Sequence, residues 1–144
     1  MRIKETVTKL IKKHKTNNPF VIADEKNIII QYADLGDTYG FFTHASRIKF
    51  ININNNLDET MQRFVCAHEL GHAILHPRSN TPFLKKNTFY SIDKIEVEAN
   101  TFAVELLIPD YEIENFRDTN MTINEVAGIY GVPMEVSGFK DIIK

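Results

Sequence analysis

Two histidines and a glutamate in the segment 68–72 are the residues with the clearest capacity for chemistry. The segment reads His-Glu-Leu-Gly-His and so carries the H-E-x-x-H pattern. In a helix, His68 and His72 lie one turn apart on the same face, where both imidazoles can bind one metal ion. Glu69 then lies beside the metal rather than on it, and its carboxylate can take a proton from a metal-bound water. The pattern therefore indicates a zinc hydrolase.

A catalytic zinc site needs three protein ligands and one open position, so a third ligand must come from elsewhere in the chain. A second predicted helix, over residues 94–107, offers Glu96 and Glu98. We favour Glu96, because Asn100 lies one turn further along the same face and could accept the far N–H of a ligating histidine. Glu98 points about 200° round the helix from Glu96. The two are therefore not expected to be ligands together, and Glu98 is the reserve candidate.

The pentapeptide also has a purely structural interpretation. Matches to H-E-x-x-H occur by chance, and a helix with two surface histidines and a salt-bridging glutamate would look the same. Two features favour the metal site. His68 and His72 replace apolar residues on a face that is predicted to pack inward, where an unpaired polar side chain is costly. A second inward-facing carboxylate also follows downstream.

The other histidines have weaker claims to a functional role. His76 lies one turn after His72 and could reach the same site. A histidine at the end of a helix, however, more often caps the last helical carbonyls. His14 and His44 stand alone, and we interpret both as surface or structural residues.

Two further residues of the same helix are interpreted through packing. Cys66 lies about 200° round the helix from His68, which predicts a buried small apolar residue rather than a ligand. Gly71 lowers helix stability, so we expect it to serve the close approach of another element or of a substrate.

The composition is that of an ordinary globular protein, and we expect residues 1–144 to form a single domain. The apolar fraction is 43%, the charged fraction 25% and the net charge −2. This charge offers no electrostatic argument for a nucleic-acid or membrane partner. A single cysteine excludes an intrachain disulfide. The N-terminus lacks the apolar region of a secretory signal, and no apolar run could span a bilayer. These observations predict a cytoplasmic protein.

The first third of the chain predicts helices followed by strands. Apolar residues at helical spacing predict an amphipathic helix over residues 2–15, which ends at Asn17-Asn18-Pro19. A short helix over residues 20–26 follows. Runs rich in β-branched and aromatic residues predict three strands with a hairpin loop at 44–47; the strands are Asn27–Tyr32, Tyr39–Thr43 and Ile48–Ile53.

The rest of the chain is predicted to be mainly helical. Asn56 is a suitable N-cap, with Glu59 as its capping-box partner, for a helix that runs to about Leu75 and ends at His76-Pro77. Its predicted inner face carries Met61, Phe64, Val65, His68, His72 and Leu75. An irregular loop over residues 77–92 leads to the 94–107 helix. Weaker helical segments at 122–130 and 133–139 follow. The predicted fold class is α+β, with a small and mostly antiparallel sheet.

Two sequence runs together resemble the ImmA/IrrE family of bacterial and phage metallopeptidases. Residues 67–76 read A-H-E-L-G-H-A-I-L-H, and residues 96–109 read E-V-E-A-N-T-F-A-V-E-L-L-I-P. The family joins H-E-L-G-H to E-x-x-A-N-x-F-A-x-x-L-L-x-P, and both halves match in order. The resemblance covers nearly the whole chain. It implies a zincin-like fold with 122–144 as a small C-terminal helical extension. It also implies Zn²⁺ on His68, His72 and Glu96, with Glu69 as the catalytic glutamate.

The function implied by the resemblance is that of a zinc-dependent endopeptidase, encoded by a bacterium or phage. The family's substrates are helix-turn-helix repressors, often encoded next door on a mobile element or prophage, and their cleavage releases silenced genes. The oxyanion-stabilising residue stays open among Tyr90, His76 and Tyr111. The substrate, the cleavage site, the trigger and the oligomeric state also stay open. The alternative is a non-catalytic, zinc-stabilised regulatory or partner-binding protein, which needs the ligands but not Glu69.

The expected partner is therefore a repressor protein rather than DNA. Residues 122–133 are faintly similar to a helix-turn-helix, but without a basic recognition helix a packing or substrate-docking role is favoured over DNA binding. A substrate segment should lie extended along a sheet edge, where unpaired backbone groups can bind it. The strands Tyr39–Thr43 and Ile48–Ile53 are the candidates for that edge.

Overall fold

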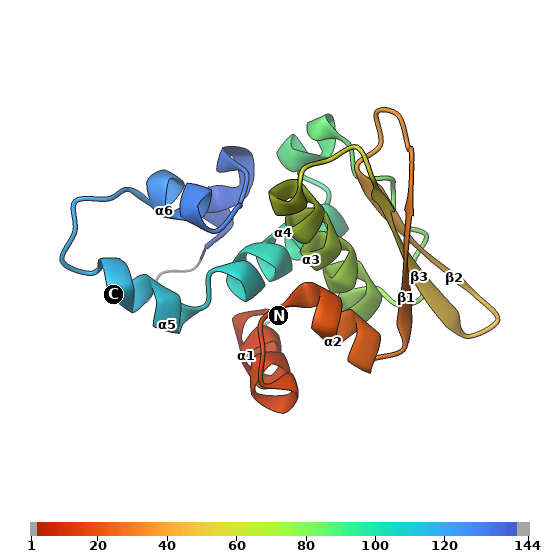
Figure 1. Ribbon diagram of the computed structural model, residues 1–144, viewed down its shortest axis with the longest axis horizontal. Coiled ribbons are helices and arrows are strands. Elements are labelled where there is room, and N and C mark those ends of the chain that lie inside the picture. Colours follow the sequence, from red (N-terminus) through yellow and green to blue (C-terminus); the bar gives the residue numbers. More distant parts are fainter. Residues whose placement is uncertain (1–2, 141–144) are drawn as a thin grey trace.

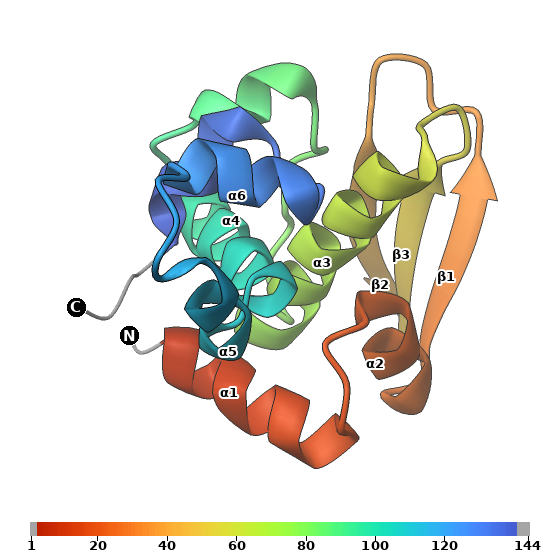
Figure 2. The ribbon, with the colours of Figure 1, turned by 60° about the vertical axis from the view of Figure 1, so that its left-hand side comes forward.

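One buried helix, α3 (Glu59–Leu75), lies between a small sheet and α4 (Lys94–Leu107). A computed structural model describes residues 3–140 of the chain (Figure 1). Figure 2 shows α3 with the sheet on one side and α4 (Lys94–Leu107) on the other. Residues 64–73 of α3 are all buried. The helix that carries the H-E-x-x-H pattern is thus at the centre of the α+β fold.

The first two helices are those that the sequence predicts. Helix α1 (Ile3–His14) buries Ile3, Val7 and Leu10 at helical spacing. Helix α2 (Pro19–Glu25) begins with proline at its first position, and the side chain of its N-cap, Asn18, accepts a hydrogen bond from the N–H of Phe20 at 3.0 Å. Arg2, part of the predicted first helix, lies outside the described residues.

The sheet is mixed rather than mostly antiparallel. Its strands are β1 (Ile28–Ala33), β2 (Gly40–Ala45) and β3 (Ile48–Asn54), in the order β1-β3-β2. The β2–β3 pair is an antiparallel hairpin, and β1 runs parallel to β3. A local hairpin signal predicts that β2 and β3 pair, but it does not determine which of them lies beside β1. Since β3 is central, only β2 of the two predicted edge candidates lies at an edge.

The hairpin turn is shorter than the predicted loop at 44–47. His44 and Ala45 continue β2, and the turn itself is formed by Ser46 and Arg47. Both turn residues have positive φ, 49° and 74°, as a two-residue type I′ turn requires. The turn matches the twist of the flanking strands, so pairing extends to its base.

The segment 77–92 is more ordered than the predicted irregular loop. Leu84 forms a β-bridge with Gly40, in which the Leu84 N–H donates to the Gly40 carbonyl at 2.8 Å. A 3-10 helix, η1 (Lys86–Tyr90), follows. Leu84 is fully buried. The bridge covers the Gly40 end of the β2 edge.

Helix α3 begins two residues later than predicted, and its N-cap is Asp58 rather than Asn56. The Asp58 carboxylate accepts a hydrogen bond from the N–H of Met61 at 2.8 Å. Asn56 is used in the preceding turn, where its N–H donates to the Asn54 side chain and its own amide donates to Asp34. Because Asn56 makes these contacts, the helix begins at Glu59, after Asp58.

The C-terminal part contains α6 (Ile123–Ile129), which has a capping box between Thr122 and Glu125, and a 3-10 helix, η3 (Met134–Phe139). The second predicted helix is therefore 3-10 rather than α. A short α5 (Asp110–Ile113) and a 3-10 turn, η2 (Glu114–Phe116), were not predicted. The part belongs to the same buried core as α3, through Val126, Ala127, Val132 and Val136. This burial agrees with the predicted packing role.

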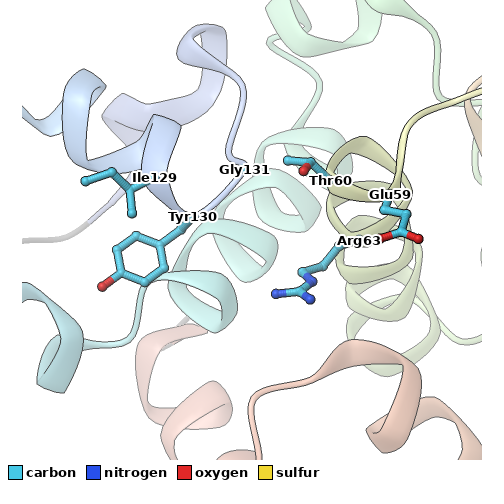
Figure 3. A pocket seen from close by; sticks show the side chains of 6 residues that line it. All are labelled: Glu59, Thr60, Arg63, Ile129, Tyr130 and Gly131. Carbon is cyan, nitrogen blue, oxygen red and sulfur yellow. The ribbon is translucent and has the colours of Figure 1, made fainter.

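The turn after α6 approaches the first turn of α3 closely. Gly131 has a φ of 75°, and a Cβ at this position would collide with Thr60. A cleft of about 200 Å³ lies beside this contact (Figure 3). Its lining residues are Glu59, Thr60, Arg63, Ile129, Tyr130 and Gly131. No helix among residues 3–140 is long and apolar enough to cross a membrane.

Candidate metal centre

The packing of α3 against α4 brings His68, His72 and Glu96 together. One ligand atom from each residue lies within 4.8 Å of the others. The His68 Nε2 is 3.2 Å from Glu96 Oε1, and the His72 Nε2 is 2.9 Å from Glu96 Oε2. The three side chains are at most 1% exposed. The structure thus brings together the three residues that the sequence predicts as ligands.

Unpartnered polar atoms inside this cluster show that its residues fit a metal ion. His72 Nε2 and Glu96 Oε2 are buried 2.9 Å from each other, and neither has a hydrogen-bond partner outside the cluster. Burying such groups without partners is costly. Two imidazoles and a carboxylate are the donor set of catalytic zinc sites, and ligand bonds of about 2.0–2.2 Å place tetrahedral donors about 3.3–3.5 Å apart. The two separations between histidine and glutamate, 3.2 and 2.9 Å, are slightly shorter than that spacing.

His68 is oriented by Asn100, as the sequence predicts. The Asn100 Oδ1 lies 2.8 Å from His68 Nδ1, on the far side of the ring from Glu96. The amide oxygen can only accept, so the hydrogen bond places the proton of a neutral His68 on Nδ1. The nitrogen that faces the cluster is then free to bind a metal.

His72 is contacted by His76, and His76 by Glu98. The two Nδ1 atoms of His72 and His76 are 3.0 Å apart, and His76 Nε2 lies 2.8 Å from Glu98 Oε1. Glu98, the reserve ligand, therefore faces His76 and is not part of the metal cluster. His76 is the C-cap residue of α3, but its backbone N–H, rather than its ring, donates to the His72 carbonyl. Sequence reasoning missed this contact chain, although the i to i+4 spacing of the two histidines was a signal for it.

Glu69 is fully buried beside the cluster. Its carboxylate lies 4.0 Å from His68 Nε2, and neither of its oxygens has a hydrogen-bond partner. Burial raises the pKa of Glu69 to about 8, with His72 opposing the shift and Glu96 adding to it. A dication in the cluster would favour the ionised carboxylate.

Glu96 is the anionic member of the cluster. Burial alone would raise the pKa of Glu96, but hydrogen bonds and attraction from His68 and His72 outweigh it and lower the pKa to about 2. A carboxylate that stays ionised at neutral pH is suited to bind a cation.

Three predictions about residues outside the cluster are confirmed. Cys66 is fully buried. At Gly71 a Cβ would lie 3.0–3.1 Å from atoms of Phe102, so this glycine allows α4 to approach. His14 has a structural role, as predicted, and its Nδ1 lies 2.6 Å from Glu25 Oε1. That contact depends on how α1 and α2 pack, which local sequence does not reveal.

The three candidates for oxyanion stabilisation differ in their surroundings. Both ring nitrogens of His76 are engaged by His72 and Glu98. Tyr90 lies in η1, ahead of α4, and is 66% exposed. Tyr111 lies in α5 and is also exposed. Of the three, His76 therefore already has a polar partner at each ring nitrogen.

A groove runs along the outer end of β2, beyond the bridge that covers Gly40. It has a volume of about 300 Å³ and lies between the strand and the segment that follows α3. Its lining residues are Phe42, Thr43, His44, Ser79, Asn80, Thr81 and Phe83. This part of the β2 edge is where an extended peptide has room.

Comparison with known proteins agrees with this geometry. The family described as the IrrE N-terminal-like domain matches residues 23–140. The chain is 49% identical over 141 residues to "Uncharacterized immunity region protein 2" of Bacillus phage phi105, covering 97% of this chain and 89% of that protein. It is 37% identical over 142 residues to "Metallopeptidase ImmA" of Bacillus subtilis (strain 168), covering 96% and 83%.

Proposed function

The chain belongs to the ImmA/IrrE family of metallopeptidases, and from that premise we propose that it is a zinc-dependent endopeptidase that cuts a helix-turn-helix repressor. The family implies a divalent metal, and the cluster of His68, His72 and Glu96 is suited to zinc. The phage relative's name places that protein in an immunity region, which supports a repressor as the substrate. The buried core that extends from Ile3 to Val136 supports a single domain.

In this proposal the chain's own residues bind the metal and move the proton. Zinc held by His68, His72 and Glu96 would polarise the scissile carbonyl and lower the pKa of the attacking water. Glu69 would take the proton from that water onto a carboxylate oxygen and pass it to the leaving amine. Asn100 would keep the proton of His68 on the nitrogen that faces away from the metal.

The buried and unpartnered carboxylate of Glu69 is the observation that carries the enzyme proposal. The non-catalytic alternative needs the three ligands but has no use for a fourth polar side chain beside them. A fully buried carboxylate without a hydrogen-bond partner lowers stability. Such a cost is expected at a site whose chemistry requires the group.

Access of the substrate requires local opening, because the cluster and Glu69 are at most 1% exposed. We infer that a peptide enters beside β2, where the groove lined by Phe42 and Phe83 follows the strand edge. An extended segment can form main-chain hydrogen bonds there. A folded helix cannot lie extended, so the cut is expected in a linker or a locally unfolded stretch of the repressor.

The test is to mix the purified chain, Zn²⁺ and any helix-turn-helix repressor found encoded beside its gene, and to follow fragments by mass spectrometry. We expect one cut, and Glu69→Gln should retain zinc but lower the rate by about a hundredfold or more. Glu59→Gln is the matched control, because Glu59 is an exposed glutamate of the same helix. Regulation in cells by the Glu69→Gln protein at the normal level would favour the non-catalytic alternative.

A further inference from the structure

The contact chain from His72 through His76 to Glu98 connects a predicted ligand to a carboxylate on another helix. It uses the facing Nδ1 atoms of the two histidines, 3.0 Å apart, and the 2.8 Å contact from His76 Nε2 to Glu98 Oε1. We propose that His76 and Glu98 are positioning residues of the metal site, which set the tautomer and the ring orientation of His72. The inference rests on the proposed metal site but not on peptide cleavage.

The order of donors and acceptors in this chain follows from which nitrogen of His72 faces the cluster. His72 directs Nε2 at Glu96, so that nitrogen must carry no proton when a metal is bound. A neutral imidazole has one proton, which then lies on Nδ1 and is donated to His76 Nδ1. His76 must in turn carry its proton on Nε2, where it is donated to Glu98. In each hydrogen bond the donor is therefore the residue nearer the metal and the acceptor is the residue nearer the Glu98 carboxylate.

A residue that only caps the helix would not make these ring contacts. His76 already has a backbone contact typical of a cap, since its N–H donates to the His72 carbonyl at 2.8 Å. Its ring makes two further contacts, and one accepts while the other donates. A lysine could cap the helix as well, but it has no acceptor for the His72 N–H.

The geometry of helix α4 gives its two glutamates different partners. Glu96 faces the metal cluster, and Glu98, about 200° further round the helix, reaches the ring of His76 at the end of α3. The side chains of Glu98 and His76 are 13% and 7% exposed, so solvent screens the contact between them only weakly. The two histidine ligands are thereby held differently: His68 by an amide and His72 by an imidazole that is itself held by a carboxylate.

Metal affinity of the 144-residue chain tests the inference, with Co²⁺ as the probe. Its dissociation constant is measured by chelator competition and its environment by the visible absorption spectrum. We expect His76→Ala and Glu98→Ala each to weaken Co²⁺ binding by about 10- to 100-fold, the range for partners of metal-bound histidines. Glu98→Gln should bind within a few-fold of the unmodified chain, because its amide oxygen still accepts from His76. Glu25→Ala is the matched control, since it removes a carboxylate from His14, a histidine outside the site.

The double variant separates positioning from a general loss of structure. Because Glu98 acts through His76, the His76→Ala/Glu98→Ala protein should bind Co²⁺ no more weakly than His76→Ala alone. Imidazole ¹⁵N NMR of the metal-loaded chain should show His72 protonated on Nδ1. If His76→Ala does not fold, the Co²⁺ affinities of His76→Gln and Glu98→Ala still test the inference.

Three results would overturn the inference. Unchanged Co²⁺ affinity and spectrum in Glu98→Ala is one, and fully additive losses in the double variant are another. The third is coordination of the metal through His72 Nδ1. Failure of the unmodified chain itself to bind Co²⁺ or Zn²⁺ would refute the proposed metal site, and this inference with it. Metal binding without repressor cleavage would refute only the proposed substrate.

Discussion

A single methyl group added at Gly71 should destabilise the protein, although glycine is normally the weaker helix former. In an exposed helix, replacing glycine by alanine stabilises by about 1 kcal/mol. At Gly71 the new Cβ would lie 3.0 Å from Phe102 Cδ1 and 3.1 Å from its Cβ and Cγ. The ring could turn, but the Phe102 Cβ can move only with the backbone of α4. Phe102 is fully buried, so its neighbours leave it little room to move.

Overpacking of this kind costs about 1–3 kcal/mol, which exceeds the gain in helix propensity. We therefore expect Gly71→Ala to lower the free energy of unfolding by about 1 kcal/mol, or the Tm by about 3 °C. Gly128→Ala is the matched control. Gly128 also lies in a helix, α6, but a Cβ there would have no neighbour within 4 Å. That substitution should stabilise by about 0.5 kcal/mol.

Urea denaturation of the two variants and the unmodified chain measures both effects. Co²⁺ affinity provides a second measurement, because Gly71 lies between His68 and His72 at the contact of α3 with α4. A shift of α4 moves Glu96 relative to both histidines, and metal sites tolerate displacements of only about 0.5 Å. Gly71→Ala should therefore bind Co²⁺ more weakly, and Gly128→Ala should not. Equal stabilisation by both substitutions would show that the close approach of Phe102 is not a constraint.

Three further predictions concern the metal site, the core and the end of the described chain. Asn100→Leu, of similar volume, should weaken Co²⁺ binding by about tenfold in chelator competition, and unchanged affinity would show that its amide oxygen orients nothing. Cys66 is fully buried and burial raises the pKa of its thiol, so Ellman's reagent should label it only in urea; rapid native labelling would contradict this. Burial alone would raise the pKa of Asp110, but hydrogen bonds from Lys140 and Lys4 hold the pKa below 3.8. Its stabilising effect is present above that pH and is lost as the pH falls through the lowered pKa. Lys140→Met would also remove the 2.6 Å contact between Lys140 Nζ and the buried carboxylate of Glu105, and we expect this loss to account for most of a decrease in stability of about 2 kcal/mol at pH 7. Asp110 is 43% exposed, so solvent weakens its share; the substitution should still raise the pH of acid unfolding measured by circular dichroism, and an unchanged acid midpoint would refute the ionic contact.

The chemistry of the site could be read largely from the sequence, because it depends on short spacings within helices. His68 and His72 are one turn apart, and helix geometry alone places them on one face. The same argument ranked Glu96 above Glu98 and placed Asn100 where it could accept from a ligating histidine, and in the structure that histidine is His68. Helices α1 to α4, the three strands and the α+β class also follow from local periodicity and turn residues.

Tertiary structure decided what depends on contacts between elements that are distant in the chain. The neighbour of β1 is β3 rather than β2, and this choice made the sheet mixed and left only one hairpin strand at an edge. The side chain of Asn56 donates to Asp34 rather than capping α3, and the N-cap of α3 is Asp58.

The role of Glu98 was decided in the same way, since only the packing of α4 against α3 brings its carboxylate to His76. Periodicity determines which face of a helix a residue occupies. It does not determine which residue of another helix meets that face, because that depends on how the whole core packs.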